Sequence, residues 1–177
     1  TLTDGSSSTY SGGKFGGGVD FESSSSDYLH AADSATLSQT GDITLASWIK
    51  PESVTAATEF AIAGKWDGAN ESYLFEQYGD EIRLRMDSSA DYTTTDTANL
   101  ATGTWYHVAG VYDSSEAKIT LYVNGERKDS TVTGTIPSSI GDDTGRFSMR
   151  QHINCALSTL TLITIYVMYR HRKTEQG

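Results

Sequence analysis

Apolar and polar residues alternate at every second position in several short segments, and this alternation restricts the possible fold more than any other feature. Residues 118–123 read KITLYV and run directly into Asn124-Gly125. Successive side chains of a strand point to opposite faces of a sheet. Asn-Gly is the preferred centre of a two-residue hairpin turn, because both positions need a positive φ. The segment therefore predicts a half-buried strand that ends in a tight hairpin.

The same alternation recurs along the chain before residue 150. It is found in residues 43–50 (ITLASWIK), in 73–86 on either side of Gly79-Asp80, and in 106–112 ahead of the turn sequence DSSEA. Turn signals recur roughly every ten residues, the spacing of antiparallel strands in a sandwich or barrel. No segment in this part of the sequence has the pattern of a long amphipathic helix. The chain is therefore predicted to be all-β.

The alternation also assigns side chains to faces. Ile43, Leu45 and Ile49 share one face of their strand, and Trp48 lies on the other. Packed sheets need large apolar side chains between them, so Trp48 and Trp105 also suit a core position with an acceptor for each indole N–H. We expect His107 to be a packed or hydrogen-bonded strand residue.

The charge distribution excludes one class of partner. Residues 1–150 hold 10 Lys and Arg against 22 Asp and Glu, a net charge of −12, while residues 151–177 hold 3 against 1. An acidic surface is repelled by phosphate backbones, so nucleic acid is not an expected partner. The first residues, TLTDGSSSTY, contain no signal-peptide pattern, and we expect the chain to be part of a longer polypeptide.

Four blocks in a fixed order carry a family resemblance. The stretch "GKFGGGVDFESSSSDYLHAADSATLSQTGDITLASWIKP", followed by "GTWYHVAGVYD" and "KITLYVNGERK", resembles the laminin-G-like branch of the concanavalin A-like lectin/glucanase superfamily over residues 13–150. The resemblance implies an antiparallel two-sheet jelly-roll sandwich, in a secreted or cell-surface module that binds carbohydrate or protein. We therefore expect residues 1–150 to form one such module, truncated at its N-terminus.

Both ends depart from the family pattern. Members often hold calcium with a loop near the N-terminus, and this sequence starts where that loop would end. Calcium is therefore the one cofactor considered; Asp27 and Asp142-Asp143 offer oxygen ligands, but no metal-binding residue is assigned. Residues 151–177 form an atypical apolar and basic tail with three open interpretations: final strands, a membrane span over residues 151–169, or an ending read in a shifted frame.

Catalytic motifs are missing from the sequence. Retaining glucanases of this superfamily carry E-x-D-x-E or E-x-D-x-x-E on one strand, so that two carboxylates face one sugar bond. Neither pattern occurs here; the nearest cluster, Glu76, Asp80 and Glu81, straddles a turn and is expected to be solvated. The sequence also lacks G-x-S-x-G, H-E-x-x-H and paired cysteines. The chain is thus predicted not to be an enzyme.

Binding residues are expected near turns. Sugar rings stack their C–H faces on exposed aromatic rings, while amides and carboxylates bind the hydroxyls. The candidates for a ligand site are Trp66, Asp67, Asn70, Tyr78 and Tyr92. A tryptophan near a turn also commonly packs back over the sandwich edge. The predicted function is extracellular recognition of a polysaccharide, another glycan or a surface protein; the alternatives are a structural spacer and an auxiliary domain of a carbohydrate-active enzyme.

Overall fold

The computed structural model describes residues 3–5, 8–22, 27–66, 71–87, 90–94, 98–128, 130–142, 144–150 and 160–168. These residues contain strands and no helix. The strands are β1 (Thr3–Asp4), β2 (Thr9–Gly12), β3 (Gly17–Glu22), β4 (Tyr28–Ala31), β5 (Ile43–Lys50), β6 (Glu59–Trp66), β7 (Glu71–Tyr78), β8 (Glu81–Met86), β9 (Ala90–Thr94), β10 (Tyr106–Asp113), β11 (Lys118–Val123), β12 (Glu126–Lys128), β13 (Ser130–Gly134), β14 (Phe147–Arg150) and β15 (Leu160–Met168).

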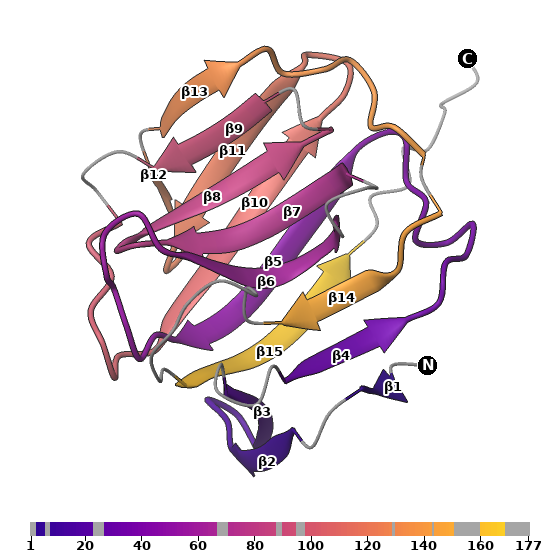
Figure 1. Ribbon diagram of the computed structural model, residues 1–177. Helices are drawn as coiled ribbons and strands as arrows, with labels where there is room; N and C mark the ends of the chain where they lie inside the picture. Colours follow the sequence, from indigo (N-terminus) through magenta and orange to yellow (C-terminus); the bar gives the residue numbers. More distant parts are fainter. Residues whose placement is uncertain are drawn as a thin grey trace, which may run out of the picture.

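The strands form two antiparallel sheets that pack face to face. The eight-stranded sheet has the order β1-β4-β14-β6-β7-β8-β9-β13, and the seven-stranded sheet the order β12-β11-β10-β5-β15-β3-β2. In Figure 1, β7 and β8 of one sheet are drawn across β5 and β10 of the other. The predicted all-β jelly-roll sandwich is therefore confirmed.

The predicted turns lie where the sequence placed them. Asn124 and Gly125 have φ angles of 53° and 81° and connect β11 to β12. Gly79, with a φ of 60°, lies in the turn between β7 and β8. Because a left-handed backbone conformation is strained for residues with a Cβ, glycine at these two positions fixes where each hairpin ends.

The core lies between the sheets and consists of the alternating apolar residues. Val108, Leu121, Leu84 and Phe75 are all fully buried. Ile43, Leu45 and Ile49 are also buried on the inner face of β5. The core position expected for Trp48 is wrong, because Trp48 follows the alternation and lies half-buried on the outer face. Trp105, just before β10, is half-buried as well.

Two strands late in the chain occupy central positions. β14 lies between β4 and β6 in one sheet, and β15 lies between β3 and β5 in the other. The segment with three open interpretations thus contains a strand at residues 160–168, whereas residues 151–159 and 169–177 lie outside the described residues. Each late strand joins two parts of a sheet that are separated in the sequence.

Candidate functional site

Three neighbouring strands place a charged and aromatic group on the outer face of the eight-stranded sheet. The core-facing residues of β8 are Ile82, Leu84 and Met86, so Arg83 and Arg85 face outward. The register sets Glu76 opposite Arg83, and Leu74 opposite both Arg85 and Gly64. We call the set Glu59, Trp66, Glu76, Tyr78, Arg83 and Arg85 the outer-face network.

An apolar floor supports this network. Ala61, Leu74 and Trp66 form a small buried cluster apart from the main core. The Arg85 guanidinium lies over the Trp66 ring, 4.6 Å from its centroid, and the Arg83 guanidinium lies over the Tyr78 ring at 4.2 Å. A guanidinium is weakly hydrated and planar, so it stacks on an aromatic ring while its N–H groups stay available at the edge.

Glutamates bind both guanidiniums from the side. Arg83 Nε donates to Glu76 Oε1 at 2.5 Å, and Arg83 Nη2 donates to Glu59. Arg85 Nη1 lies 3.7 Å from Glu59 Oε1, the oxygen that accepts the hydrogen bond from Arg83. The Glu76 side chain is fully buried, whereas the Glu59 side chain is 30% exposed. The expectation that Glu76 is solvated at the hairpin tip is therefore wrong: its strand position turns it under Arg83.

The protonation of Glu76 depends on this burial. The pKa of Glu76 is raised from 4.5 to about 7, mainly because the carboxylate is removed from water and also because of the neighbouring charge of Glu59, while Arg83 and Arg85 oppose the shift. Burial disfavours the charged form of a carboxyl group more than the single close guanidinium favours it. Near neutral pH the outer-face network therefore changes its net charge.

A pH-dependent stability follows from this shift. Because the folded pKa lies above the unfolded one, the folded state holds more protons between pH 4.5 and 7. Stability from this group is then fully present below pH 4.5 and is lost as the pH rises to 7. We expect the free energy of unfolding to fall with pH in this window, with a limiting slope of about 1.4 kcal/mol per pH unit. Urea unfolding at pH 5, 6, 7 and 8 measures it.

Two variants isolate the contribution of Glu76. Glu76→Gln stays neutral and should lose the slope. Glu126→Gln is the matched control, because Glu126 is exposed and a hydrogen bond from Lys128 lowers its pKa, which puts its titration below the window. A wild-type stability that is flat or rises between pH 5 and 7 would contradict the assignment.

The structure brings together two of the five predicted ligand residues. Trp66 ends β6, is only 9% exposed and stacks under Arg85, while Tyr78 ends β7 and is half-buried under Arg83. Glu59 contacts both arginines and so links the two rings. Tyr92 is opposite Leu84 in β9 and packs against the main core. Asp67 and Asn70 lie outside the described residues.

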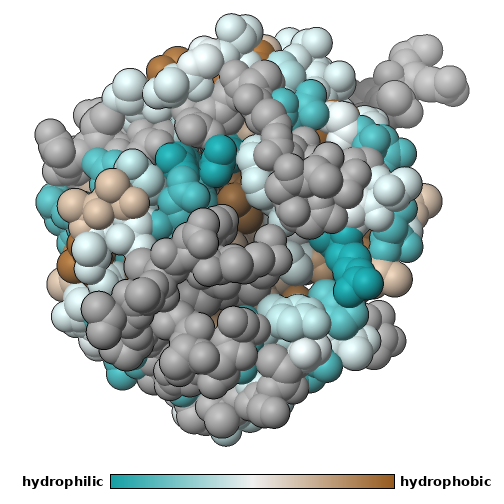
Figure 2. Space-filling model, viewed as in Figure 1, coloured by the Kyte–Doolittle hydropathy of each residue, from teal (hydrophilic) through white to brown (hydrophobic). Residues whose placement is uncertain are grey.

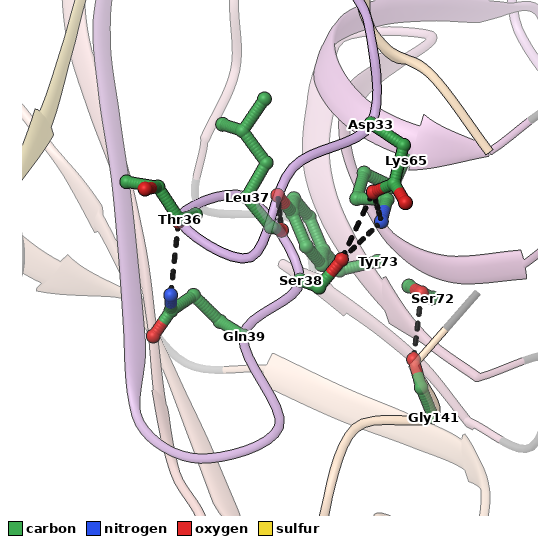
Figure 3. A network of polar contacts seen from close by, with 9 residues as sticks. All are labelled: Asp33, Thr36, Leu37, Ser38, Gln39, Lys65, Ser72, Tyr73 and Gly141. Atoms are coloured by element: carbon green, nitrogen blue, oxygen red, sulfur yellow. Dashed lines mark hydrogen bonds and ion pairs between the residues drawn. The ribbon is translucent and has the colours of Figure 1, made fainter. Parts of the chain in front are cut away.

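The opposite side of β6 anchors the loop after β4. Lys65 is fully buried, and its Nζ donates to Asp33 Oδ1 at 2.8 Å and to Ser38 Oγ at 2.9 Å (Figure 3). The Lys65 hydrogen bond is the main reason that the pKa of Asp33 is lowered. Tyr73 Oη also donates to the carbonyl of Leu37 at 3.1 Å. The side chain next to Trp66 in sequence therefore has a packing role.

Arg83 and Arg85 are not among the ligand residues predicted from the sequence, although the sequence indicates which face of the sheet they occupy. Arg83 and Arg85 alternate with core residues, which already places them outside. Their partners are set by cross-strand register, and β6 changes register against β7 between Ala61 and Ala63 and again between Lys65 and Trp66. Such irregularities leave no period in the sequence. Sequence reasoning could therefore identify the face but not the contacts.

The described parts of the chain contain neither a metal-ligand cluster nor a membrane-spanning helix. No group of three or more His, Cys, Asp or Glu side chains there is arranged to hold a metal ion. The same residues include no helix with the length and hydropathy of a membrane span.

Solved structures with the same architecture include several toxin binding domains. The binding domain of Paraclostridial Mosquitocidal Protein 1 aligns with a TM-score of 0.76 and 15% identity, over 94% of this chain and 43% of that one. A botulinum neurotoxin type C that depends on interaction with two ganglioside molecules to enter cells aligns with a TM-score of 0.68 and 12% identity, over 94% and 42%. The binding domain of botulinum neurotoxin DC, in complex with rat synaptotagmin II, gives 0.71 and 10%, over 94% and 42%.

The solved structures and the family model support different conclusions. At 10 to 15% identity the solved structures show a shared fold, and the chain spans about two fifths of their length. A search of curated protein sequences found no match. The Laminin_G_3 family model, described as concanavalin A-like lectin/glucanases superfamily, matches residues 23–154. That range covers most of the chain and includes strands of both sheets, so the chain belongs to the concanavalin A-like lectin/glucanases superfamily.

Proposed function

We propose that this chain is a non-catalytic, extracellular recognition module that binds a glycan through the outer-face network. The observation that carries the proposal is the pair of guanidiniums stacked on Trp66 and Tyr78 and joined by Glu59. Arginine N–H groups donate to sugar hydroxyls and acidic substituents, and a carboxylate accepts from hydroxyls. The network therefore presents both donors and acceptors at fixed positions.

The energetics of burial support a role beyond stability. Apolar residues of similar volume usually stabilise a fold as well as a buried ion pair does, because the charges lose their hydration. Here the Arg83 side chain is 8% exposed and Glu76 is fully buried, yet Arg85 and Glu59 keep 23% and 30% of their side-chain surface exposed. A rigid buried half that holds a partly exposed half is the arrangement expected of a preorganised binding surface. Figure 2 shows the molecule from the same side as Figure 1, with hydrophilic groups beside hydrophobic ones.

Catalysis has weaker support on this surface. The two glutamates share one arginine, so each carboxylate is engaged with Arg83. A glycosidase needs one carboxyl group as acid and another as nucleophile or base on opposite sides of the sugar bond. A binding role is consistent with the family and with the binding domains among the solved relatives.

Binding of two arginine variants to a glycan array tests the proposal. Arg85→Gln removes the guanidinium over Trp66 and leaves the more buried Arg83 in place. Arg127→Gln, at an exposed position of β12, is the matched control. We expect wild type and Arg127→Gln to bind the same glycans and Arg85→Gln to lose at least tenfold in affinity. No binding by wild type to a broad array, or equal binding by Arg85→Gln, would contradict the proposal.

A surface protein is the second candidate ligand. It is favoured by the botulinum neurotoxin DC binding domain, which is solved in complex with rat synaptotagmin II. If the ligand is a protein, wild type would still bind a cell surface from which glycosidases have removed the glycans. Arg85→Gln would lose this binding. The spacer alternative predicts that wild type binds neither kind of surface.

A requirement for bound calcium is also a proposal. Addition of a chelator to the glycan array tests it, because binding that needs calcium would then be lost.

A further inference from the structure

A second aromatic group lies on the outer face of the other sheet. On β5, Trp48 faces away from the core and is half-buried. The Phe15 and Trp48 rings are nearly perpendicular, with centroids 5.5 Å apart and planes at 85°, and the His107 ring lies 5.4 Å away on the neighbouring strand. Lys14 places its Nζ 5.2 Å from the centroid of the Trp48 ring. We call Lys14, Phe15, Trp48 and His107 the Trp48 surface.

The Trp48 surface is built from a strand on one side and a hairpin turn on the other. His107 is held at its backbone: its N–H donates to Asn124 Oδ1 at 2.9 Å, and the Asn124 N–H donates to its carbonyl at 2.6 Å. Lys14 and Phe15 instead lie in the turn between β2 and β3, closed by a bond from Gly13 N–H to the Gly16 carbonyl at 2.8 Å. Gly16 has a φ of 73°, and a Cβ there would meet nothing within 4 Å.

Exposure separates this surface from an ordinary packed cluster. Phe15 is 66% exposed, although it packs against an indole. The face of an exposed aromatic ring is the surface on which the C–H groups of a sugar stack. The ammonium of Lys14 lies over the half-buried indole, so Phe15 is the more exposed ring and Lys14 the adjacent cation. This pairing is complementary to a ring-shaped ligand that carries negative charge beside an apolar face.

Two lysines lie at or beside the Trp48 surface of an acidic chain. The chain has a net charge of −10. Around Trp48, by contrast, Lys14 makes no ion pair with any described residue, and neither does Lys50, two positions along the same face of β5. A cation that makes no ion pair within the described part of an acidic chain attracts an anion locally, while the overall charge limits nonspecific capture.

We infer that the Trp48 surface is a binding site for a glycan that bears carboxylate groups. A sugar ring stacks on Phe15, and its carboxylate pairs with the Lys14 ammonium, with the His107 imidazole beside the indole as a further polar contact. This site is separate from the outer-face network, because Trp48 and Arg85 belong to different sheets.

Matched ligand pairs test the requirement for carboxylate. Tetragalacturonate and its methyl ester, and 3′-sialyllactose and lactose, differ in negative charge. Titrations of isotope-labelled chain, followed by amide NMR shifts, should show saturable binding of at least one acid, at least tenfold tighter than its neutral partner and weaker at higher salt. Absence of binding by both acids, or equal binding of acid and neutral forms, would overturn the inference.

Matched variants assign the binding to this surface. Phe15→Ala and Lys14→Gln should each lose at least tenfold in affinity for the acid. Tyr10→Ala and Lys118→Gln are the controls, because Tyr10 is 67% exposed on β2 and the Lys118 side chain is 50% exposed on β11. Binding that is lost in Arg85→Gln and kept in Phe15→Ala would overturn this inference while leaving the proposed function intact. The converse result would support this site and contradict the other.

Discussion

Arg83→Met is expected to destabilise the fold by about 3–5 kcal/mol, because a buried carboxylate then loses its closest cation. Arg83 binds Glu76, whose side chain is fully buried, and also the partly exposed Glu59. Methionine fills similar volume and can still contact the Tyr78 ring, so the loss is mainly electrostatic. The pKa of Glu76 should rise further above its already raised value of about 7. Urea unfolding at pH 8, where wild-type Glu76 is mostly charged, gives the largest effect.

A second substitution separates charge from packing. In Arg83→Met with Glu76→Gln, no buried charge is left at this position, so most of the lost stability should return. Arg127→Met, at an exposed arginine of β12, should change stability by less than about 0.5 kcal/mol. If the double variant is as unstable as Arg83→Met, packing rather than charge is the cause. The ion pair would then not be the main contact of Arg83.

Gly64→Ala is expected to cost about 2–3 kcal/mol, because the added methyl group would overpack a backbone that cannot move aside. A Cβ at Gly64 would lie 2.4 Å from the carbonyl oxygen of Tyr73 and 2.9 Å from the Cα of Leu74. Both atoms belong to the paired strand β7. A movement of β7 that made room for the methyl group would displace Leu74 and Trp66, which form the floor under Arg85. Thermal unfolding, with tryptophan fluorescence as a local signal, measures both effects.

The control glycine lies in the other sheet. A Cβ at Gly12 would meet nothing within 4 Å, and its φ is not in the left-handed region. Gly12→Ala should therefore be neutral within about 0.5 kcal/mol. Equal stability of the two alanine variants would show that β6 and β7 can separate locally, in which case the outer-face network is less rigid than its contacts indicate.

Local patterns in the sequence predicted faces and turns better than they predicted partners. The alternation in residues 43–50 placed Trp48 opposite Ile49, and the structure agrees; the general preference of large aromatic residues for a core gave the opposite answer and was wrong. Alternation follows from backbone geometry, whereas residue size is only a statistical tendency. The pairing of β5 with β10 and β15 joins residues far apart in sequence, and no local signal specifies it.

The candidate sites show the same division. The positions of Trp66 and Tyr78 near turns make them candidates, and the alternation with Ile82, Leu84 and Met86 indicates that Arg83 and Arg85 lie on the outer face of their strand. Their assembly depends on the register changes within β6, which have no sequence period. The Trp48 surface depends on a hairpin turn that brings residue 15 over residue 48. Glycine-rich segments indicate a turn but not where its side chains will lie.

The position of β15 has a consequence for folding during synthesis. This strand is made after every other described strand, yet it fills the gap between β3 and β5. Until residues 160–168 leave the ribosome, both neighbouring strands present unpaired N–H and C=O groups along one edge. Open edges of this kind pair readily with other chains. We therefore expect slow arrival of the last described strand to favour aggregation of the nascent chain.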